Sequence, residues 1–262
     1  MYFIDVQGTL IDDKNQLPIN GAIDFIDLLN EKEIPYIVIT NNTKLQSNEF
    51  LTSLNNMGLN IDEKNYIDPF TLLKNVATKK KVAAFGQSSF LEVLKKLDYE
   101  LDFEAPETLL VSIKKEYTNE DYSSMIEAAL KTDDLIGMHE TSIYSKQGRR
   151  YPGVGAIMQM IQFATNKEYK VVGKPSVDFY DMAKEKLKKS YSLETLEFND
   201  ITIISDDMMG DLVGAIKLDM KAVFVLSGKI KDAQEVIPTL EKKFHPNLIC
   251  KNIAEVNERL SI

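Results

Sequence analysis

Short apolar runs alternate with longer amphipathic stretches along this chain, and that alternation limits the folds open to it. Runs such as Tyr36 to Thr40 and Ile201 to Ile204 have the length and the β-branched content of buried strands. The stretch from Ile19 to Asn30 repeats its apolar residues at helical spacing instead. Strands that feed helices in this way are typical of a parallel sheet, so the sequence predicts an α/β fold.

The number of strand–helix units indicates more than one sheet. Roughly eight or nine such units would make a very wide single sheet. A second domain inserted between Thr40 and Lys174 is the more economical arrangement, with crossings near Thr78 to Lys81 and near Asn166 to Tyr169. We therefore predict a core domain of residues 1–80 and 170–262, and an inserted α/β domain of residues 81–169.

Charge and cysteine content exclude some classes of partner. The net charge is −9, from 31 basic and 40 acidic side chains, which argues against non-specific binding to nucleic acid or to an anionic membrane. No apolar run approaches the length of a membrane span. Cys250 is the single cysteine, so an intrachain disulfide is impossible and a reducing, cytoplasmic setting is the simplest expectation.

Polar residues gather where predicted strands end, which is where parallel α/β sheets place their ligand sites. Each alone would more often be a turn, a helix cap or a surface residue. Their joint order along the chain favours a site. The set comprises Asp5-Val6-Gln7-Gly8-Thr9, Thr40-Asn41-Asn42, Lys174 within Gly173-Lys174-Pro175, and Ser205-Asp206-Asp207 with Asp211.

These residue types suit phosphoryl transfer. A carboxylate can attack phosphorus and form an aspartyl-phosphate. Two carboxylates from separate strands supply the oxygen ligands that Mg²⁺ prefers. A lysine offsets charge on the transferring group, while a hydroxyl and backbone N–H groups hold its oxygens.

The same series resembles the four motifs of the haloacid dehalogenase-like hydrolases, and more narrowly those of the NagD / 4-nitrophenylphosphatase branch, subfamily IIA. That branch typically carries a TNN segment after its second strand and a VGKP segment on leaving its cap domain, as at Thr40-Asn41-Asn42 and Val172 to Pro175. The resemblance covers nearly the whole chain. It implies a Rossmann-like parallel-sheet core and an inserted α/β cap that closes over the substrate.

The resemblance also implies roles for individual residues. Asp5 would be the nucleophile and a Mg²⁺ ligand, Asp206 a second ligand, and Asp211 a direct or indirect supporter of the metal. The backbone carbonyl of Gln7 would reach the metal as well. The phosphoryl group would be contacted by residues of the TNN segment, Thr40, Asn41 and Asn42, and bridged to the nucleophile by Lys174.

Gln7 departs from the pattern of the phosphatases in this superfamily, which normally have an aspartate two residues after the nucleophile. That aspartate protonates the leaving oxygen and then activates water, and an amide can do neither. Loss of a general acid/base typically costs about 10²–10⁴-fold in rate.

Four explanations of Gln7 are open. It is an engineered substitution, the mark of a slow phosphatase, the mark of a phospholigand-binding protein that has lost turnover, or a sign of dehalogenase chemistry. The last is disfavoured, because the intact Asp206 and Asp211 and the IIA-like cap match the Mg²⁺-dependent enzymes.

A basic segment in the inserted domain is the second departure. Residues 140 to 150 are predicted to form a polar loop that includes Lys146-Gln147-Gly148-Arg149-Arg150. One hypothesis is that Arg149 or Arg150 binds an anionic group of the substrate, because a guanidinium suits carboxylate or phosphate. The alternative is a solvated basic loop.

The leading hypothesis is a Mg²⁺-dependent phosphatase that acts on a small phosphorylated metabolite through an aspartyl-phosphate, slowed by Gln7. The alternative is a catalytically impaired phospholigand-binding protein on the same fold. The resemblance leaves a homodimer possible, because caps in this branch often contribute to dimer contacts.

Overall fold

The chain forms two compact units, and the second is inserted into the first. The computed structural model describes residues 1–12, 14–146 and 149–260, except for the side chains of residues 145 and 146. The first unit, here called the core unit, comprises Met1–Thr40, Asn48–Ile67 and Tyr180–Ile262. The second, here called the cap unit, comprises Asn41–Ser47 and Asp68–Phe179.

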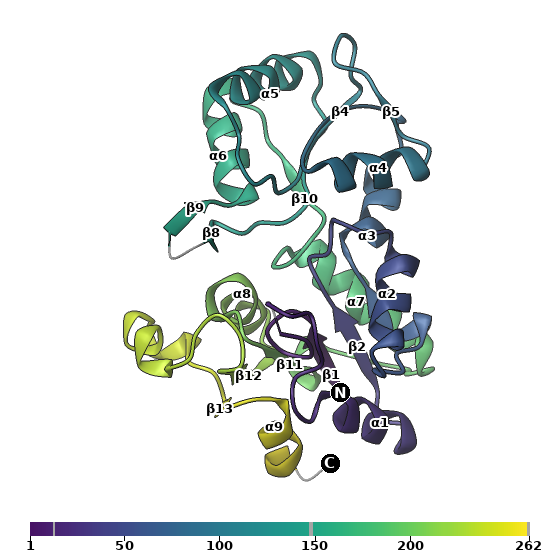
Figure 1. Ribbon diagram of the computed structural model, residues 1–262, viewed down its shortest axis with the longest axis vertical. Coiled ribbons are helices and arrows are strands. Elements are labelled where there is room, and N and C mark those ends of the chain that lie inside the picture. Colours follow the sequence, from purple (N-terminus) through teal and green to yellow (C-terminus); the bar gives the residue numbers. More distant parts are fainter. Residues whose placement is uncertain (13, 147–148, 261–262) are drawn as a thin grey trace. The chain divides into compact units, whose positions relative to one another are not determined.

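A parallel sheet forms the centre of the core unit (Figure 1). Its strand order is β13-β12-β11-β1-β2-β3, so β1 lies between β11 and β2. Because neighbouring strands are parallel, their carboxyl ends meet at one edge of the sheet. The strands are β1 (Tyr2–Asp5), β2 (Tyr36–Ile39), β3 (Tyr66–Ile67), β11 (Thr202–Ser205), β12 (Lys221–Val225) and β13 (Leu248–Cys250).

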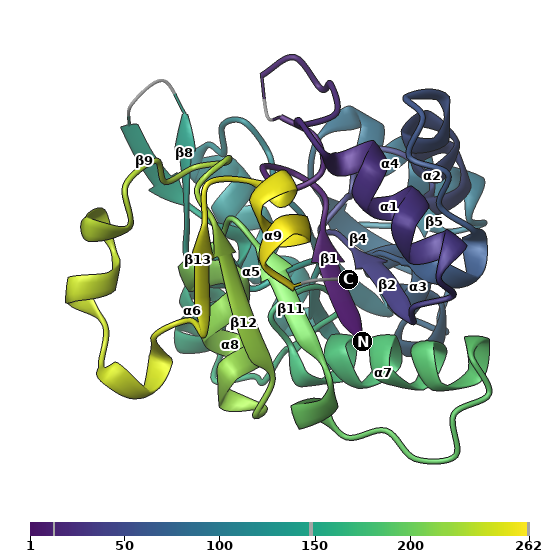
Figure 2. The same cartoon turned by 90° about the horizontal axis from the view of Figure 1, so that it is seen from below.

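Helices cover both faces of this sheet (Figure 2). One face packs against α1, α2 and α9, and its apolar cluster includes Ile4, Phe25 and Val256. The other face carries α7, where the ring of Tyr180 stacks on Phe3 at 6.3 Å between centroids. The helices are α1 (Ala22–Glu31), α2 (Ser47–Asn56), α7 (Val177–Ser190), α8 (Val213–Lys217) and α9 (Ile253–Leu260).

The cap unit has its own parallel sheet, with strand order β10-β7-β6-β4-β5. Helices α5 and α6 pack on one face of it through residues such as Met125 and Ile157. The elements are α3 (Pro69–Val76), β4 (Lys81–Phe85), α4 (Ser88–Lys96), β5 (Glu100–Leu101), β6 (Thr108–Val111), α5 (Asn119–Lys131), β7 (Leu135–Gly137), α6 (Val154–Thr165) and β10 (Lys170–Val171).

The predicted polar loop of residues 140–150 is wrong in part, because the segment contains an antiparallel hairpin. Strands β8 (Ile143–Lys146) and β9 (Arg149–Pro152) pair with each other. Tyr144 and Tyr151 lie opposite each other in the register, and their rings stack at 5.4 Å between centroids. Aromatic cross-strand pairs of this kind stabilise a hairpin in which most of the other residues are polar. Residues 147 and 148 lie outside the described part of the chain.

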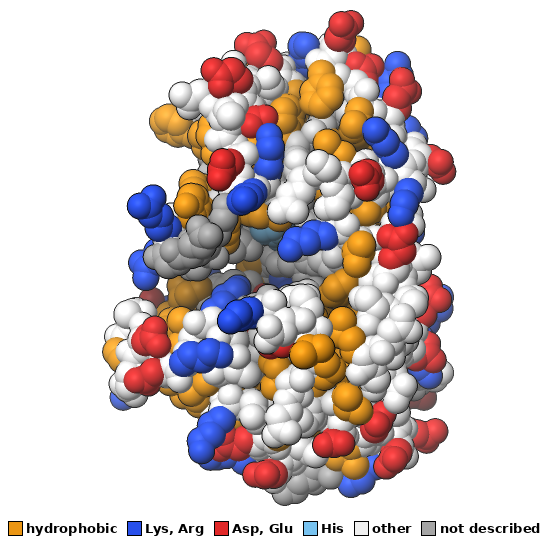
Figure 3. Space-filling view, viewed as in Figure 1, with side chains coloured by type: hydrophobic (Ala, Val, Ile, Leu, Met, Phe, Trp, Pro, Cys, Tyr) orange, Lys and Arg blue, Asp and Glu red, His pale blue; other side chains and the backbone are white. Residues whose placement is uncertain are grey.

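The predicted fold class is confirmed: two parallel α/β sheets, one of them inserted. Residues 41–47, 68–80 and 170–179 group with the cap unit, whereas the predicted inserted domain spans residues 81–169. Side chains of both charge signs are spread over the face shown in Figure 3. Across the described residues, no helix is both long and apolar enough to cross a bilayer.

Candidate functional site

Two buried carboxylates mark the carboxyl edge of the core sheet. Asp5 is the last residue of β1, and Asp206 directly follows β11, its neighbour in the sheet. Asp5 is 5% exposed and Asp206 1% exposed. Carboxylates are rarely this deeply buried without a compensating partner, so the pair requires a physical explanation.

The hydroxyl of Thr9 links the two carboxylate-bearing segments. Its Oγ1 donates to Oδ2 of Asp5 at 3.3 Å and accepts the backbone N–H of Asp206 at 3.1 Å. Thr9 is itself fully buried. Because one hydroxyl both donates and accepts, it fixes the end of β1 against the turn that follows β11.

Two glycines leave room for the Asp206 carboxylate. A Cβ at Gly8 would lie 2.4 Å from Cγ of Asp206, and a Cβ at Gly228 would lie 1.8 Å from its Oδ2. Gly8 also has a φ of +78°, which favours glycine in any case. The backbone N–H of Lys229 donates to the same Oδ2 at 2.8 Å. The carboxylate is therefore held between two turns that approach it with backbone alone.

The electrostatics of this position disfavour a lone negative charge. Burial, followed by the nearby charge of Asp5, raises the pKa of Asp206 well above its ordinary value, while Lys229 acts in the opposite direction. Two carboxylates that crowd each other in a buried site are stabilised by a cation. The arrangement thus has the charge of a cation site.

The donor set fits Mg²⁺ in particular. Among the described residues, no three His, Cys, Asp or Glu side chains gather as a metal cluster. A divalent ion here would therefore rely on two carboxylates, together with backbone and water oxygens. Mg²⁺ commonly binds proteins through one or two carboxylates and keeps several waters, so the fit is good.

Asp211 supports the turn after β11. The hydroxyl of Ser205 donates to Oδ2 of Asp211 at 2.7 Å and accepts the backbone N–H of Asp207 at 3.0 Å. The hydroxyl of Tyr180 donates to the backbone carbonyl of Asp211 at 3.2 Å. Asp211 is 3% exposed, and these contacts give it a positioning role in the Asp206 turn.

Gln7 makes a direct contact with Thr40. Oγ1 of Thr40 donates to Oε1 of Gln7 at 2.9 Å, which joins the loop after β1 to the end of β2. Thr40 is fully buried, and Gln7 is partly exposed. The side-chain amide is thus held by a hydroxyl, at the position where the resemblance to the superfamily's phosphatases implies a carboxyl group.

Asn41 and Lys174 are hydrogen-bonded to each other within the cap unit. The backbone N–H of Lys174 donates to Oδ1 of Asn41 at 2.8 Å, and Nδ2 of Asn41 donates to the carbonyl of Lys174 at 3.3 Å. Gly173 lies so close that a Cβ there would be 2.7 Å from Oδ1 of Asn41. Lys174 is 2% exposed. Asn41 therefore fixes the backbone that carries the buried ammonium group.

The remaining predicted site residues of the cap unit have separate settings. The side chain of Asn42 bonds to the backbone of its own turn: Oδ1 accepts from Lys44 and Leu45, and Nδ2 donates to the Leu45 carbonyl. Arg149 and Arg150 are exposed on β9. Asn42 is thus occupied in shaping the TNN turn, while both arginines face solvent.

Three residues near the carboxylate pair had no role assigned from sequence: Thr9, Tyr180 and Lys229. Thr9 stood within the first motif, and its hydroxyl proves to be the link between strands. Lys229 follows Ser227-Gly228, and its ammonium pairs with Asp207. Tyr180 lies on a helix, where nothing in the sequence separates it from an ordinary core aromatic residue.

Comparisons with known proteins agree with the geometry. A family model described as haloacid dehalogenase-like hydrolase matches residues 2–100, and a second, described as HAD-hydrolase-like, matches residues 171–256. An acid sugar phosphatase of Staphylococcus saprophyticus is 24% identical over 92% of this chain and 98% of its own. A phospholysine phosphohistidine inorganic pyrophosphate phosphatase of Mus musculus is 23% identical over 91% of this chain and 87% of its own.

Solved structures share the fold over almost the whole chain. A p-nitrophenyl phosphatase from Archaeoglobus fulgidus has a TM-score of 0.80 at 22% identity, with 98% of both chains covered. NagD from E. coli K-12 has a TM-score of 0.74 at 18% identity, with 97% of this chain and 96% of that chain covered.

The close approach at Gly228 gives a testable expectation. Gly228→Ala should lower the free energy of unfolding by about 1–3 kcal/mol, because its methyl group overlaps the carboxylate of Asp206. Combining it with Asp206→Ala should recover about 1 kcal/mol or more of that loss. Urea unfolding of the four proteins of this cycle measures the coupling. Strictly additive losses would show that the two residues are not in contact.

Proposed function

The chain belongs to the haloacid dehalogenase-like hydrolases, and on that premise we propose that it is a phosphatase that hydrolyses a small phosphorylated metabolite through an aspartyl-phosphate on Asp5. The observation that carries the proposal is the buried pair Asp5 and Asp206, joined by the Thr9 hydroxyl at the carboxyl edge of the core sheet. The phosphatases among the similar proteins support the same reaction class.

The first chemical step is attack by Asp5. A carboxylate oxygen of Asp5 forms a bond to phosphorus, the bond from phosphorus to the ester oxygen breaks, and the leaving alcohol takes a proton. In the second step water attacks phosphorus, inorganic phosphate leaves and the Asp5 carboxylate is restored. The hydrogen bond from Thr9 orients Asp5 for the attack.

Gln7 determines how fast these steps run. An amide cannot give a proton to the leaving oxygen or take one from water, so both transfers fall to solvent or substrate. Thr40 has one hydroxyl proton, and its contact with Oε1 of Gln7 uses it. If the side-chain amide of Gln7 rotates so that Oε1 and Nε2 exchange places, Nε2 can donate a hydrogen bond to Oγ1 of Thr40. The hydroxyl proton of Thr40 is then available for a phosphoryl oxygen. We therefore assign Gln7 a binding and orienting role.

Mg²⁺ is the proposed cofactor, held by Asp5, Asp206 and the backbone carbonyl of Gln7. When bound, it offsets the charge of the two carboxylates and of the phosphoryl group. Asp211 maintains the Asp206 turn through Ser205. The phosphoryl-contact roles that the resemblance implies for Lys174, Asn41 and Asn42 stay proposals; all three belong to the cap unit, and the side chain of Asn42 also shapes its own turn. The cytoplasmic location and the homodimer stay predictions.

Replacing Gln7 by aspartate should restore the missing proton transfer. We expect Gln7→Asp to raise the turnover of 4-nitrophenyl phosphate by about 10²–10⁴-fold, because a carboxyl group can act as general acid and base. Phosphate release with Mg²⁺ present measures the change. Asp5→Asn in the Gln7→Asp background is the matched control and should be inactive.

The same assay separates the two candidate functions. Measurable turnover by the unaltered chain supports a slow phosphatase. Saturable binding of inorganic phosphate without turnover, with activity only in Gln7→Asp, supports the phospholigand-binding alternative. If both proteins are inactive although Mg²⁺ binds, the proposed phosphatase function is wrong.

Removal of the metal should abolish activity and lower stability. In the Gln7→Asp protein, chelation should remove turnover, and Mg²⁺ should restore it while raising the melting temperature. Asp206→Asn should weaken the Mg²⁺-dependent rise in melting temperature, because one of two carboxylate ligands is lost. An equal rise in the Asp206→Asn protein would place the metal elsewhere.

The arginines of β9 are proposed to bind an anionic group of the substrate. In the Gln7→Asp background, Arg149→Ala with Arg150→Ala should raise KM for acidic phosphorylated metabolites with little change in kcat. Lys95→Ala with Lys115→Ala removes the same charge from exposed positions of the cap unit and serves as the control. An unchanged KM for every active substrate would exclude this role.

A further inference from the structure

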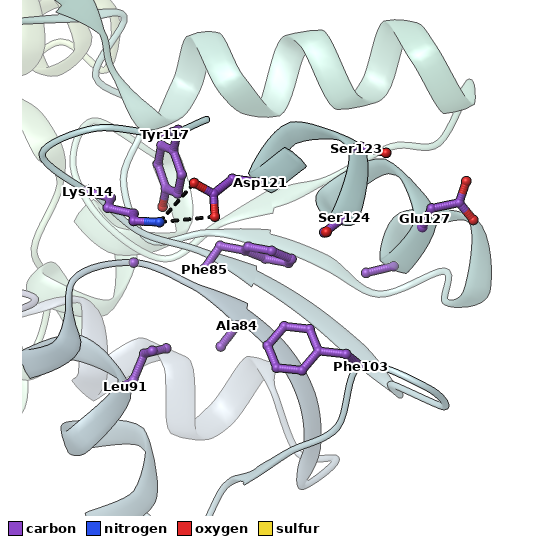
Figure 4. Close-up of a pocket in the computed structure, with 12 residues that line it drawn as sticks. Ala84, Phe85, Leu91, Phe103, Lys114, Tyr117, Asp121, Ser123, Ser124 and Glu127 are labelled. Atoms are coloured by element: carbon purple, nitrogen blue, oxygen red, sulfur yellow. Dashed lines mark hydrogen bonds and ion pairs between the residues drawn. The ribbon is translucent and has the colours of Figure 1, made fainter. Parts of the chain in front are cut away.

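The cap unit contains a pocket of about 480 Å³ that the phosphoryl site does not use (Figure 4). It lies beside β4 and the first turns of α5, and all of its lining residues belong to the cap unit. Its volume falls within the roughly 300–1,000 Å³ of small-molecule sites. Apolar and polar groups line different parts of it, so the chemistry of a ligand can be inferred from the two parts.

Two aromatic rings form the apolar part. Phe85, at the end of β4, meets Phe103 edge to face, with 5.6 Å between centroids and 80° between planes. Phe103 is 47% exposed, although most large apolar side chains of this unit are buried. A half-exposed phenyl ring beside a pocket offers a face on which a flat ring can stack.

An ion pair with unused hydrogen-bonding capacity forms the polar part. Nζ of Lys114 donates to Oδ1 and Oδ2 of Asp121 at 3.0 and 2.9 Å, which uses two of its three protons. Oδ2 of Asp121 also accepts from the backbone N–H and hydroxyl of Thr118, whereas these contacts leave Oδ1 with capacity for one more. Within the described part of the chain, one donor of Lys114 and one acceptor position of Asp121 are therefore left for a ligand, side by side.

Both members of the pair are held in place by other contacts. Asp121 and Thr118 form the capping box of α5. The hydrogen bond from the Thr118 backbone N–H lowers the pKa of the Asp121 carboxyl group, and Lys114 lowers it by a smaller amount. The ammonium of Lys114 lies 5.1 Å from the centroid of the Tyr117 ring. The Tyr117 hydroxyl is engaged by the Ser112 carbonyl. The free donor and acceptor are thus presented with little freedom to move.

We propose that this pocket binds a planar heteroaromatic ring whose edge carries an adjacent donor and acceptor, as a purine base does. The ring stacks on Phe103 and meets Phe85 edge to face, because the planes of these two phenyl rings are 80° apart. A ring nitrogen or carbonyl oxygen accepts from Lys114, and a neighbouring N–H donates to Oδ1 of Asp121. Ser124, drawn on α5 in Figure 4, offers a further hydroxyl at the wall. A purely apolar ligand would make no hydrogen bonds to Lys114 or Asp121, so it fits this pocket less well than a heteroaromatic ring.

Isothermal titration calorimetry with adenosine and guanosine tests the proposal on the full chain. These nucleosides carry no phosphate, so a phosphoryl site at Asp5 has nothing to bind. Phe103→Ala should weaken binding about tenfold or more through lost stacking. Lys114→Met should weaken it about tenfold through the lost donor, while Thr118 still holds the Asp121 carboxylate. N6,N6-dimethyladenosine keeps the ring but lacks the N–H, and should bind more weakly than adenosine.

The control variant is Phe163→Ala, which removes an equally large but 94% exposed ring from α6 of the same unit. It should leave the affinity unchanged. Thermal unfolding of each variant checks that it is folded. The proposal is overturned if neither nucleoside gives saturable binding, or if Phe103→Ala and Lys114→Met bind as tightly as Phe163→Ala. If excess inorganic phosphate competes with the nucleosides, they bind at the phosphoryl site of Asp5 and not in this pocket, and the proposal is overturned as well.

Discussion

The repulsion between Asp5 and Asp206 is the constraint on which the rest of the core unit depends. Two neighbouring parallel strands lead into buried carboxylates, Asp5 at the end of β1 and Asp206 directly after β11, and this arrangement is unfavourable without local compensation. The Thr9 hydroxyl and the Lys229 backbone N–H supply part of it. Because Gly8 and Gly228 have no side chains, two backbone turns can approach Asp206 closely. The site is therefore built mainly from backbone and small residues around two charges.

The surrounding sheet gives that arrangement its rigidity. β1 lies in the middle of the sheet, with parallel neighbours on both sides, so Asp5 cannot move without breaking ladder hydrogen bonds. Phe3 packs on Tyr180 of α7, whose hydroxyl reaches the backbone of Asp211. The same core contact that buries β1 thus also positions the turn after β11. Packing and site geometry are coupled here through a single tyrosine.

The long, periodic elements could be predicted from the sequence, and the short ones could not. The helical spacing of Ile19 to Asn30 corresponds to α1 (Ala22–Glu31), because ten residues are enough to show a repeating apolar face. Strands β3 and β5 have two residues each, which is too few to show any period. The β8–β9 hairpin was missed because its polar residues match a loop, and its strand pairing and the stacking of Tyr144 on Tyr151 show only in the structure.

The site was predictable to the extent that its residues stand at strand ends in a recognisable order. Asp5, Thr40 and Asp206 follow apolar runs, so topology alone places them at one edge of the core sheet. Their partners were not predictable, because the Thr9 link joins residues 197 positions apart in sequence. Likewise, the bonds of Asn41 to the Lys174 backbone span 133 positions.

Gln7 shows why the binding and the proton-transfer parts of such a site can separate. The contacts described above for Asp5 and Asp206 run through Thr9, Lys229 and the glycines, whereas the side chain of Gln7 accepts a hydrogen bond from Thr40. An amide in place of a carboxyl group also adds no third negative charge to a crowded pair. It keeps one hydrogen bond, to Thr40, and so remains ordered. We therefore propose that an amide at this position leaves the contacts of Asp5 and Asp206 intact and slows the steps that move a proton.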